Sequence, residues 1–285
     1  GMSAATVAAE RGHNVTLFEA ASEVGGQFNL AKVVPGKEEF HETIRYFKVQ
    51  IEKTGVDVRL NTKVNREQLE REGFDEVIVA TGVIPRGLKI EGSDAPQVLS
   101  YAEVLRGAYV GNTVAVIGAG GIGFDVSEYL LKPEHQSQPQ SLVDWQREWG
   151  VDPNPNYITE GGAVRAEVDP PIRQIYLMQR KTTPLGIGLG KTSGWVHRAQ
   201  LKKHAVRMMR GVQYKAVTDE GLWIETDGHD QLLRVDTIVV CAGQESVKEL
   251  MPKEGESTLA NYHIIGGAKL AGELDAKRAI REGAE

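Results

Sequence analysis

The stretch Val114-Ala115-Val116-Ile117-Gly118-Ala119-Gly120-Gly121-Ile122-Gly123 decides the fold. Its first four residues are typical of a buried strand, and they run directly into G-x-G-x-x-G and then into a helical stretch, 124–131. In such a unit the first glycine permits the tight turn, the second lets the backbone approach a pyrophosphate, and the third lets helix and strand pack closely. The order predicts a Rossmann unit in which Gly118, Gly120 and Gly123 contact a dinucleotide, rather than a glycine turn without a ligand.

The end of the next strand indicates which dinucleotide is bound. The apolar run 175–178 ends in Gln179-Arg180-Lys181, and the glycine-rich loop 186–194 and a helix expected over 195–209 follow. A carboxylate at the end of this strand accepts hydrogen bonds from the ribose hydroxyls of NAD, whereas arginine accommodates the 2′-phosphate of NADP. No acid occupies the position, so Arg180 and Lys181 predict NADPH. The alternative is a pair of solvated cations on a turn.

A shortened unit of the same kind opens the chain. A helical stretch over 2–11 leads through a turn to the strand 15–18, which ends at Glu19. Gly1 therefore occupies the place of the third fingerprint glycine, and the first strand of this unit is expected to be missing. A carboxylate at the strand end suits an unphosphorylated ribose, as in FAD, although strands often end in a charge for no such reason. Gly26 and Gln27 lie in a compact loop expected near the pyrophosphate.

Two similar segments, each directly after a strand and called strand exits below, predict how the units are connected. Ala80-Thr81-Gly82 follows one apolar strand and Cys241-Ala242-Gly243 follows another, with the NADP unit between them. We therefore expect an α/β fold with two Rossmann-like domains of the two-dinucleotide flavoprotein type. The NADPH-binding domain (106–244) is inserted into an FAD-binding domain (1–105 and 245–285). A final helix near 274–281 directs its N-terminal amides toward the flavin or its pyrophosphate.

Composition narrows the function classes. The 285 residues carry a net charge of −6 and show no basic stripe, so nucleic acid and anionic membranes are not expected as partners. No apolar run reaches membrane-spanning length and no signal peptide is recognisable, so a cytoplasmic location is expected. Cys241 is the only cysteine, which excludes a cysteine-ligated cluster in this chain and the C-x-x-C pair of a thioredoxin reductase. The scattered histidines predict no metal site.

Five strings extend the argument to a family: Val24-Gly25-Gly26-Gln27-Phe28-Asn29, Pro35-Gly36-Lys37-Glu38-Glu39-Phe40, 118–125, Gly190-Lys191-Thr192-Ser193-Gly194-Trp195 and Glu273-Leu274-Asp275-Ala276. They resemble the C-terminal half of bacterial NADPH-dependent 2,4-dienoyl-CoA reductases over essentially the whole chain. The trimethylamine dehydrogenases and related enoate reductases are similar at a greater distance.

The resemblance implies that different domains hold different cofactors. In that family a barrel domain, absent here, holds FMN and a [4Fe-4S] cluster, and the module resembled by this chain passes electrons from NADPH through FAD. It implies these FAD contacts: Glu19, Gln27, Lys37, Val64, Gly267, Leu274, Asp275 and Ala276. It implies these NADPH contacts: Arg180, Lys181 and Trp195. Ala80, at the strand exit, is a further expected contact.

The expected function is therefore electron entry for a dienoyl-CoA reductase of fatty acid β-oxidation. No side chain of this chain is expected to act as a catalytic acid or base, and no dienoyl-CoA reduction is expected from this chain alone. The alternative is a domain that holds a nucleotide without transferring electrons, as in a trimethylamine dehydrogenase-like or enoate reductase flavoenzyme.

Overall fold

The computed structural model describes residues 1–132, 140–154, 162–272 and 275–285. The chain divides into two compact units. The outer unit comprises Gly1–Lys32, Glu39–Ile84 and Gln244–Glu285, and the inserted unit comprises Val33–Glu38 and Pro85–Gly243. The expected insertion of one Rossmann-like unit into another is thus confirmed.

A five-stranded parallel sheet organises the inserted unit, in the order β5-β12-β6-β7-β8. Its strands are β5 (Val98–Ser100), β6 (Thr113–Ile117), β7 (Gln174–Met178), β8 (Arg207–Met209) and β12 (Thr237–Val240). The inserted unit begins at Pro85, earlier than the expected start at 106. The reason is pairing: Val98 of β5 lies opposite Ile238 of β12, which commits this segment to the inserted sheet.

The helices of the inserted unit are α5 (Tyr101–Leu105), α6 (Gly121–Leu130), α7 (Leu142–Trp149) and α8 (Gly194–Lys203). The expected helix over 195–209 is wrong in its second half. Ala205 adopts a left-handed conformation with φ 57°, which ends the helical stretch, and the chain continues into β8, where Leu177 pairs with Met208.

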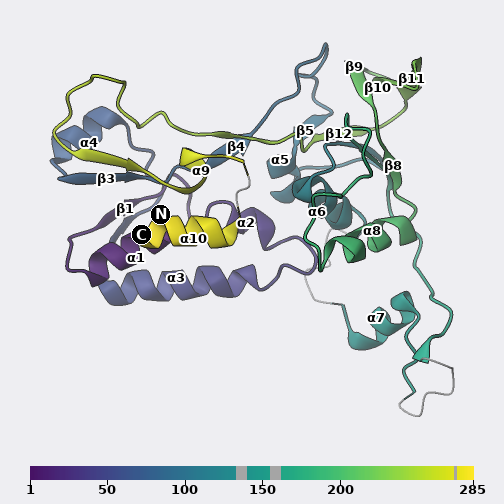
Figure 1. The fold of residues 1–285 in the computed structure, drawn as a ribbon, viewed down its shortest axis with the longest axis horizontal. Coiled ribbons are helices and arrows are strands. Elements are labelled where there is room, and N and C mark those ends of the chain that lie inside the picture. Colours follow the sequence, from purple (N-terminus) through teal and green to yellow (C-terminus); the bar gives the residue numbers. More distant parts are fainter. Residues whose placement is uncertain (133–139, 155–161, 273–274) are drawn as a thin grey trace. The chain divides into compact units, whose positions relative to one another are not determined.

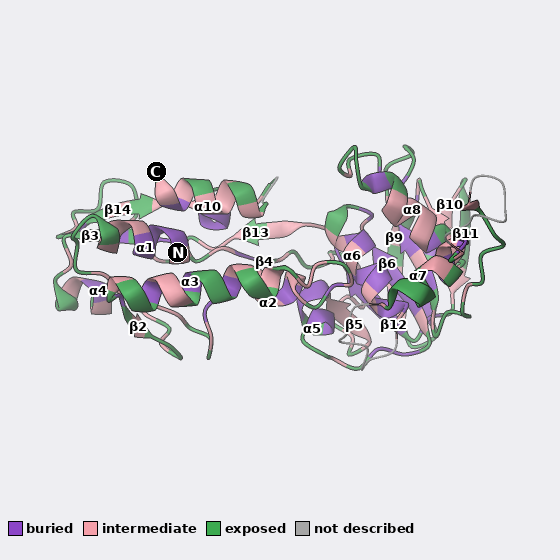
Figure 2. Cartoon of the chain, turned by 90° about the horizontal axis from the view of Figure 1, so that it is seen from below, coloured by how far each residue is buried: buried purple, intermediate pink, exposed green. Residues whose placement is uncertain are grey.

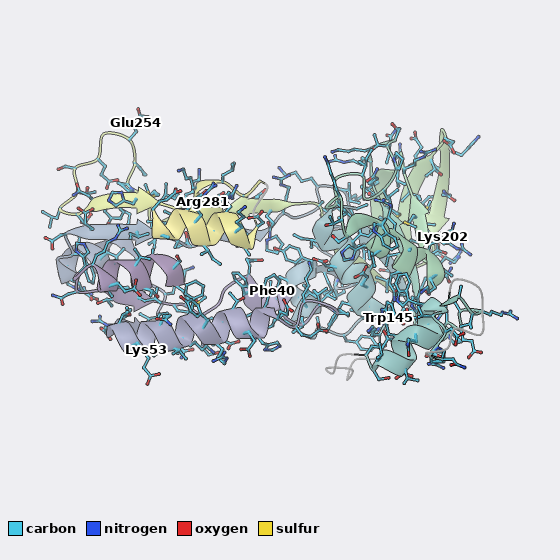
Figure 3. All side chains as sticks on the ribbon, turned by 60° about the horizontal axis from the view of Figure 1, so that its bottom comes forward. Phe40, Lys53, Trp145, Lys202, Glu254 and Arg281 are labelled. Carbon is cyan, nitrogen blue, oxygen red and sulfur yellow. The ribbon has the colours of Figure 1, made fainter. Side chains whose placement is uncertain are left out.

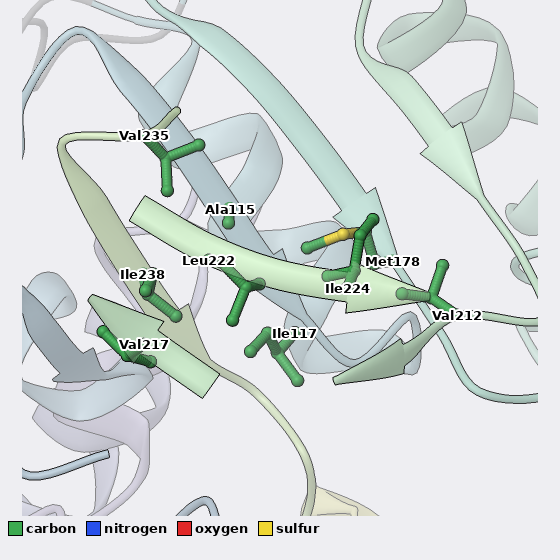
Figure 4. Packing of buried hydrophobic residues seen from close by; sticks show 9 residues of the cluster. All are labelled: Ala115, Ile117, Met178, Val212, Val217, Leu222, Ile224, Val235 and Ile238. Atoms are coloured by element: carbon green, nitrogen blue, oxygen red, sulfur yellow. The ribbon is translucent and has the colours of Figure 1, made fainter. Parts of the chain in front are cut away.

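A three-stranded antiparallel sheet, β9 (Gln213–Thr218), β10 (Gly221–Thr226) and β11 (His229–Leu233), completes this unit. Leu222 and Ile224 of β10 are fully buried against Ala115 and Ile117 of β6 and Met178 of β7 (Figure 4). β6 and β12 are buried along almost their whole length (Figure 2). Their hydrophobic runs are those of strands covered on both faces.

The outer unit contains two separate parallel pairs, β1 (Thr16–Phe18) with β2 (Asp57–Arg59) and β3 (Glu76–Val79) with β14 (Asn261–Ile264). A third pair, β4 (Val83–Pro85) with β13 (Gln244–Ser246), forms where the chain passes between the units.

The helices of the outer unit are α1 (Met2–Glu10), α2 (Phe28–Ala31), α3 (Phe40–Thr54), α4 (Arg66–Glu72), α9 (Gly266–Lys269) and α10 (Ala276–Ala284). α1 contacts both α3 and α10 (Figure 1). Small residues let α1 and α10 approach closely: a Cβ at Gly283 would lie 3.1 Å from the backbone nitrogen of Ala4. The hydroxyl of Ser3 donates to the carbonyl oxygen of Ile280 at 2.9 Å.

The segment between α6 and β7 contains α7, which is anchored on α8. The buried carboxylate of Glu148 accepts hydrogen bonds from the Nε2 atoms of Gln140 and Gln200, each at 2.6 Å, and lies 3.2 Å from Nε2 of His204. Nζ of Lys203 lies 3.4 Å from the centre of the Trp149 ring. Figure 3 labels Trp145 of α7 and Lys202 of α8. In the described ranges, no helix is long and apolar enough to cross a membrane.

The anchoring of α7 predicts a response to acid. The hydrogen bond with His204 is the main cause that lowers the pKa of Glu148 to about 2 from its ordinary value of 4.5. A carboxylate whose pKa is lower in the folded state stabilises that state above the unfolded pKa, and the stabilisation is lost as the pH falls through the folded value. We expect the contact between α7 and α8 to weaken between pH 4.5 and about 2.

The measurement is a fluorescence titration with Trp195 and Trp223 replaced by Phe, so that Trp145 and Trp149 report on α7. E148Q should remove the acid transition. The control E167Q replaces an exposed glutamate between α7 and β7 and should leave the transition unchanged. A full transition in E148Q would show that another group controls α7.

Candidate functional site

The glycine loop after β6 is held by approaches that only glycine allows. Gly118 has φ +111°, and a Cβ there would lie 2.4 Å from the carbonyl oxygen of Cys241. A Cβ at Gly123 would lie 1.8 Å from the carbonyl oxygen of Gly118. The amide of Gly118 donates to the carbonyl oxygen of Met178 at 2.8 Å. The loop is therefore fixed among the carboxyl ends of β6, β7 and β12.

The same loop is open where a ligand would approach. Gly120 is the N-cap residue of α6 and provides no side-chain cap. A Cβ placed on Gly120 or Gly121 would meet no atom within 4 Å. Uncapped amides at a helix N-terminus favour an anion, so these residues fit a dinucleotide pyrophosphate.

Two cations stand at the carboxyl end of the neighbouring strand, β7. Arg180 and Lys181 are exposed, and in the described part of the chain neither forms an ion pair. The side chain of Gln179 shapes their turn, because its Nε2 donates to the carbonyl oxygens of Lys181 at 3.1 Å and of Thr183 at 2.6 Å. Cations without a partner on a fixed turn fit a phosphate on the adenosine ribose.

The loop over 186–194 and the start of α8 border this edge. Gly186 approaches Phe124 of α6 so closely that a Cβ would lie 2.8 Å from its ring. A Cβ at Gly194 would lie 2.7 Å from the Cβ of Leu189. Trp195 is 58% exposed in the first turn of α8, which leaves its ring accessible to a ligand.

Two side-chain pairs on α6 were not foreseen from the sequence. Nζ of Lys37 lies 2.5 Å from Oδ2 of Asp125, which places the segment Val33–Glu38 within the inserted unit. Nδ1 of His197 lies 2.7 Å from Oε1 of Glu128. Burial raises the pKa of Glu128, and the hydrogen bond with His197 opposes the rise. The partners are far apart in the chain, so no local pattern indicates them.

The single thiol has no accessible chemistry. Cys241 is buried at the end of β12, and burial raises the pKa of its thiol far above the usual range. A buried, protonated thiol is a poor nucleophile. Among the described residues, no group of three or more His, Cys, Asp or Glu side chains could hold a metal ion.

In the outer unit, Gly1 and Ala80 are brought together. Gly1 is the N-cap residue of α1, and a Cβ on it would lie 3.6 Å from the Cβ of Ala80 at the end of β3. Glu19 follows β1, and its Oε1 accepts a hydrogen bond from the amide of Ala21 at 2.9 Å. An uncapped helix start and a carboxylate at a strand end are the elements that an adenosine diphosphate moiety requires.

The Gly26-Gln27 loop lies at the start of α2. Gly26 has φ +50° and open space around the position of a Cβ. Nε2 of Gln27 donates to the carbonyl oxygen of Val83 at 3.3 Å.

The remaining expected FAD contacts serve local structure in this unit. Val64 packs against a core cluster that includes Val79. The carbonyl oxygen of Gly267 accepts a hydrogen bond from the Ser246 hydroxyl at 2.7 Å. Asp275 caps α10, which begins at Ala276. Leu274 lies outside the described residues. The roles of all these residues, and of Lys37, toward FAD stay predictions.

Comparisons with known proteins agree with this geometry. The family model of the pyridine nucleotide-disulphide oxidoreductases matches residues 1–265. A cinnamate reductase of Clostridium sporogenes is 29% identical over 270 residues, which are 94% of this chain and 35% of that protein. A metal reductase of Desulforamulus reducens is 27% identical, over 88% of this chain and 37% of that protein.

Solved structures show the same fold. A 2-naphthoyl-CoA reductase in complex with 2-naphthoyl-CoA has a TM-score of 0.78 and 26% identity, over 99% of this chain and 37% of its own. The thioredoxin reductase of T. acidophilum has a TM-score of 0.64 at 15% identity and is covered over 91% of its length, which supports the fold alone. The chain spans about a third of the length of the curated relatives described above.

The glycine loop generates a contrast between two substitutions. G123A should destabilise the inserted unit by roughly 1–3 kcal/mol, because its methyl group overlaps the Gly118 carbonyl. G120A should change stability by less than about 0.5 kcal/mol, since its backbone angles suit any residue and its surroundings are open. It should nevertheless weaken dinucleotide binding, because a methyl group there occupies the approach of the pyrophosphate. Thermal unfolding and calorimetric titration with NADP⁺ test the contrast; unchanged binding by folded G120A would contradict it.

Proposed function

The chain belongs to the pyridine nucleotide-disulphide oxidoreductase family, and from this membership we propose that it is the electron-entry module of a larger reductase. The observation that carries the proposal is the glycine loop after β6. It is closed to any side chain at Gly118 and Gly123 and open at Gly120, at the edge where Arg180 and Lys181 stand. A dinucleotide laid along this edge would meet helix amides at its pyrophosphate and cations at its ribose.

The cations favour NADPH over NADH. A hydrogen bond between charged groups contributes about 1.5–3 kcal/mol, which corresponds to about tenfold or more in affinity. NADH offers no phosphate to Arg180 and Lys181. In the described structure no carboxylate neutralises these two residues, so their charge is available to the ligand.

The outer unit is proposed to hold FAD. When bound, FAD supplies the chemistry that accepts a hydride and passes electrons onward. The part of this chain is to bind and orient: Glu19 recognises the ribose, and Gly1 and Ala80 leave room for the backbone of α1 to approach the pyrophosphate. Cys241 is buried, and the described residues contain no group of three or more His, Cys, Asp or Glu side chains that could hold a metal ion. We therefore assign binding and orientation, and no redox step, to the side chains named here.

The substrate is proposed to be a conjugated acyl thioester, with 2,4-dienoyl-CoA of fatty acid β-oxidation as the specific candidate. The motif resemblance supports it. Two similar proteins, a cinnamate reductase and a 2-naphthoyl-CoA reductase, are named for compounds in which a carbonyl group is conjugated with carbon–carbon double bonds. Reduction of such a substrate is assigned to the part of the larger protein outside this chain. FMN and a [4Fe-4S] cluster are proposed for that part.

The test is anaerobic reduction of the FAD-reconstituted protein. NADPH should bleach the visible flavin band, and NADH should require a concentration at least about tenfold higher, because it lacks the phosphate. The double variant R180Q/K181Q should strongly reduce the difference between the two nucleotides while retaining reduction by NADH. Binding of FAD without reduction by either nucleotide would contradict electron entry and favour a nucleotide-holding domain.

A further inference from the structure

The segment that leaves β8 lies directly beside the turn that carries Arg180 and Lys181. The amide of Gln179 donates to the carbonyl oxygen of Met209 at 3.0 Å, and the amide of Gly211 donates to that of Lys181 at 3.0 Å. These bonds join the two strand exits beyond the end of the regular ladder. Arg210 lies between Met209 and Gly211, the two residues that form these bonds. It is therefore at the same carboxyl edge of the sheet as Arg180 and Lys181.

Packing fixes this second segment in place. Val212 is fully buried in the core of the inserted unit, and its amide donates to the carbonyl oxygen of Gln179 at 3.1 Å. Gly211 takes the left-handed conformation with φ +68°, and a Cβ on it would lie 3.6 Å from Cγ2 of Thr182. The backbone on both sides of Arg210 is therefore held by hydrogen bonds to the segment that carries Arg180 and Lys181.

The charges at this edge are uncompensated. Arg210 is exposed and, like Arg180 and Lys181, forms no ion pair with any described residue. By contrast, Arg207 at the start of β8 donates to the hydroxyl oxygen of Tyr176 at 3.3 Å and lies over its ring. Like charges placed together repel, and an anion that binds among them removes the repulsion.

The charge of Arg180 influences a tyrosine on the segment that follows Arg210. Tyr214 lies in β9, shortly after Arg210, with a buried hydroxyl that has no hydrogen-bond partner in the described structure. Burial raises the pKa of this hydroxyl, and the positive charge of Arg180 opposes the rise. Arg180 therefore acts on the segment that also carries Arg210.

We propose that Arg210 is a specificity-determining residue that supplies a third cation to the recognition of the 2′-phosphate of NADPH. This inference rests on the proposed NADPH site and names a residue that the ribose-reading position at the end of β7 does not include. A phosphate monoester carries three strong acceptor oxygens and close to two negative charges. Cations that follow two adjacent strands can contact this phosphate from two directions, whereas NADH has no 2′-phosphate for them to bind.

The experiment measures binding without any flavin chemistry. Dissociation constants for NADP⁺ and NAD⁺, a pair that differs only in the 2′-phosphate, are determined by calorimetry at low and moderate salt. R210Q should weaken NADP⁺ binding about tenfold and leave NAD⁺ binding unchanged. R210K should retain part of the preference. The matched control R207Q removes the same charge from the other end of β8 and should not change the ratio.

The possible results distinguish a failure of the Arg210 contact from a failure of the proposed NADPH site. If R180Q loses the preference and a folded R210Q keeps it, the role of Arg210 is refuted and the NADPH site stands. If the unaltered protein binds both nucleotides equally, the NADPH preference fails and the role of Arg210 fails with it. An equal loss in R207Q and R210Q would show general electrostatic attraction and overturn a specific contact. Circular dichroism of each variant confirms folding.

Discussion

The close approach of α6 to the carbonyl of Gly118 is the constraint on which the inserted unit depends. The helix can begin directly after β6 only because no side chain stands at Gly123, where a Cβ would overlap the Gly118 oxygen. That approach aims the uncapped start of α6 at the carboxyl edge of the sheet, where the exits of β7 and β12 also lie. Packing and ligand recognition are thus coupled: the fold needs glycine at Gly118 and Gly123, and the helix start that this packing positions carries the open amides that a dinucleotide needs.

Much of this could be predicted from the sequence because the decisive contacts are local. The run from Val114 to Gly123 specifies a strand, a turn and a helix within one stretch, and the structure shows all three. The basic residues Arg180 and Lys181 could be predicted in the same way, because they directly follow the strand β7 in the sequence. The two Rossmann-like units and their insertion were recognisable from two matching strand exits.

Other features depend on contacts between distant residues, which no local pattern contains. The boundary at 85 follows from the pairing of β5 with β12, and the helix expected to reach Met209 ends because its last residues pair with β7. The ion pair of Lys37 with Asp125 joins residues 88 positions apart. Arg210 was overlooked for the same reason: it becomes a neighbour of Arg180 only when β8 lies beside β7.

The two units carry opposite charges at corresponding strand ends, and this contrast is the physical basis for assigning different dinucleotides to them. Glu19 follows β1 of the outer unit, and Arg180 follows β7 of the inserted unit. A carboxylate accepts hydrogen bonds from a diol and repels a phosphate. A guanidinium attracts a phosphate and has no acceptor for the hydroxyl protons of a diol. Exchanging the two nucleotides would place a phosphate against Glu19 and leave Arg180 without an anion. The charge pattern therefore opposes the exchanged arrangement as well as favouring the proposed one.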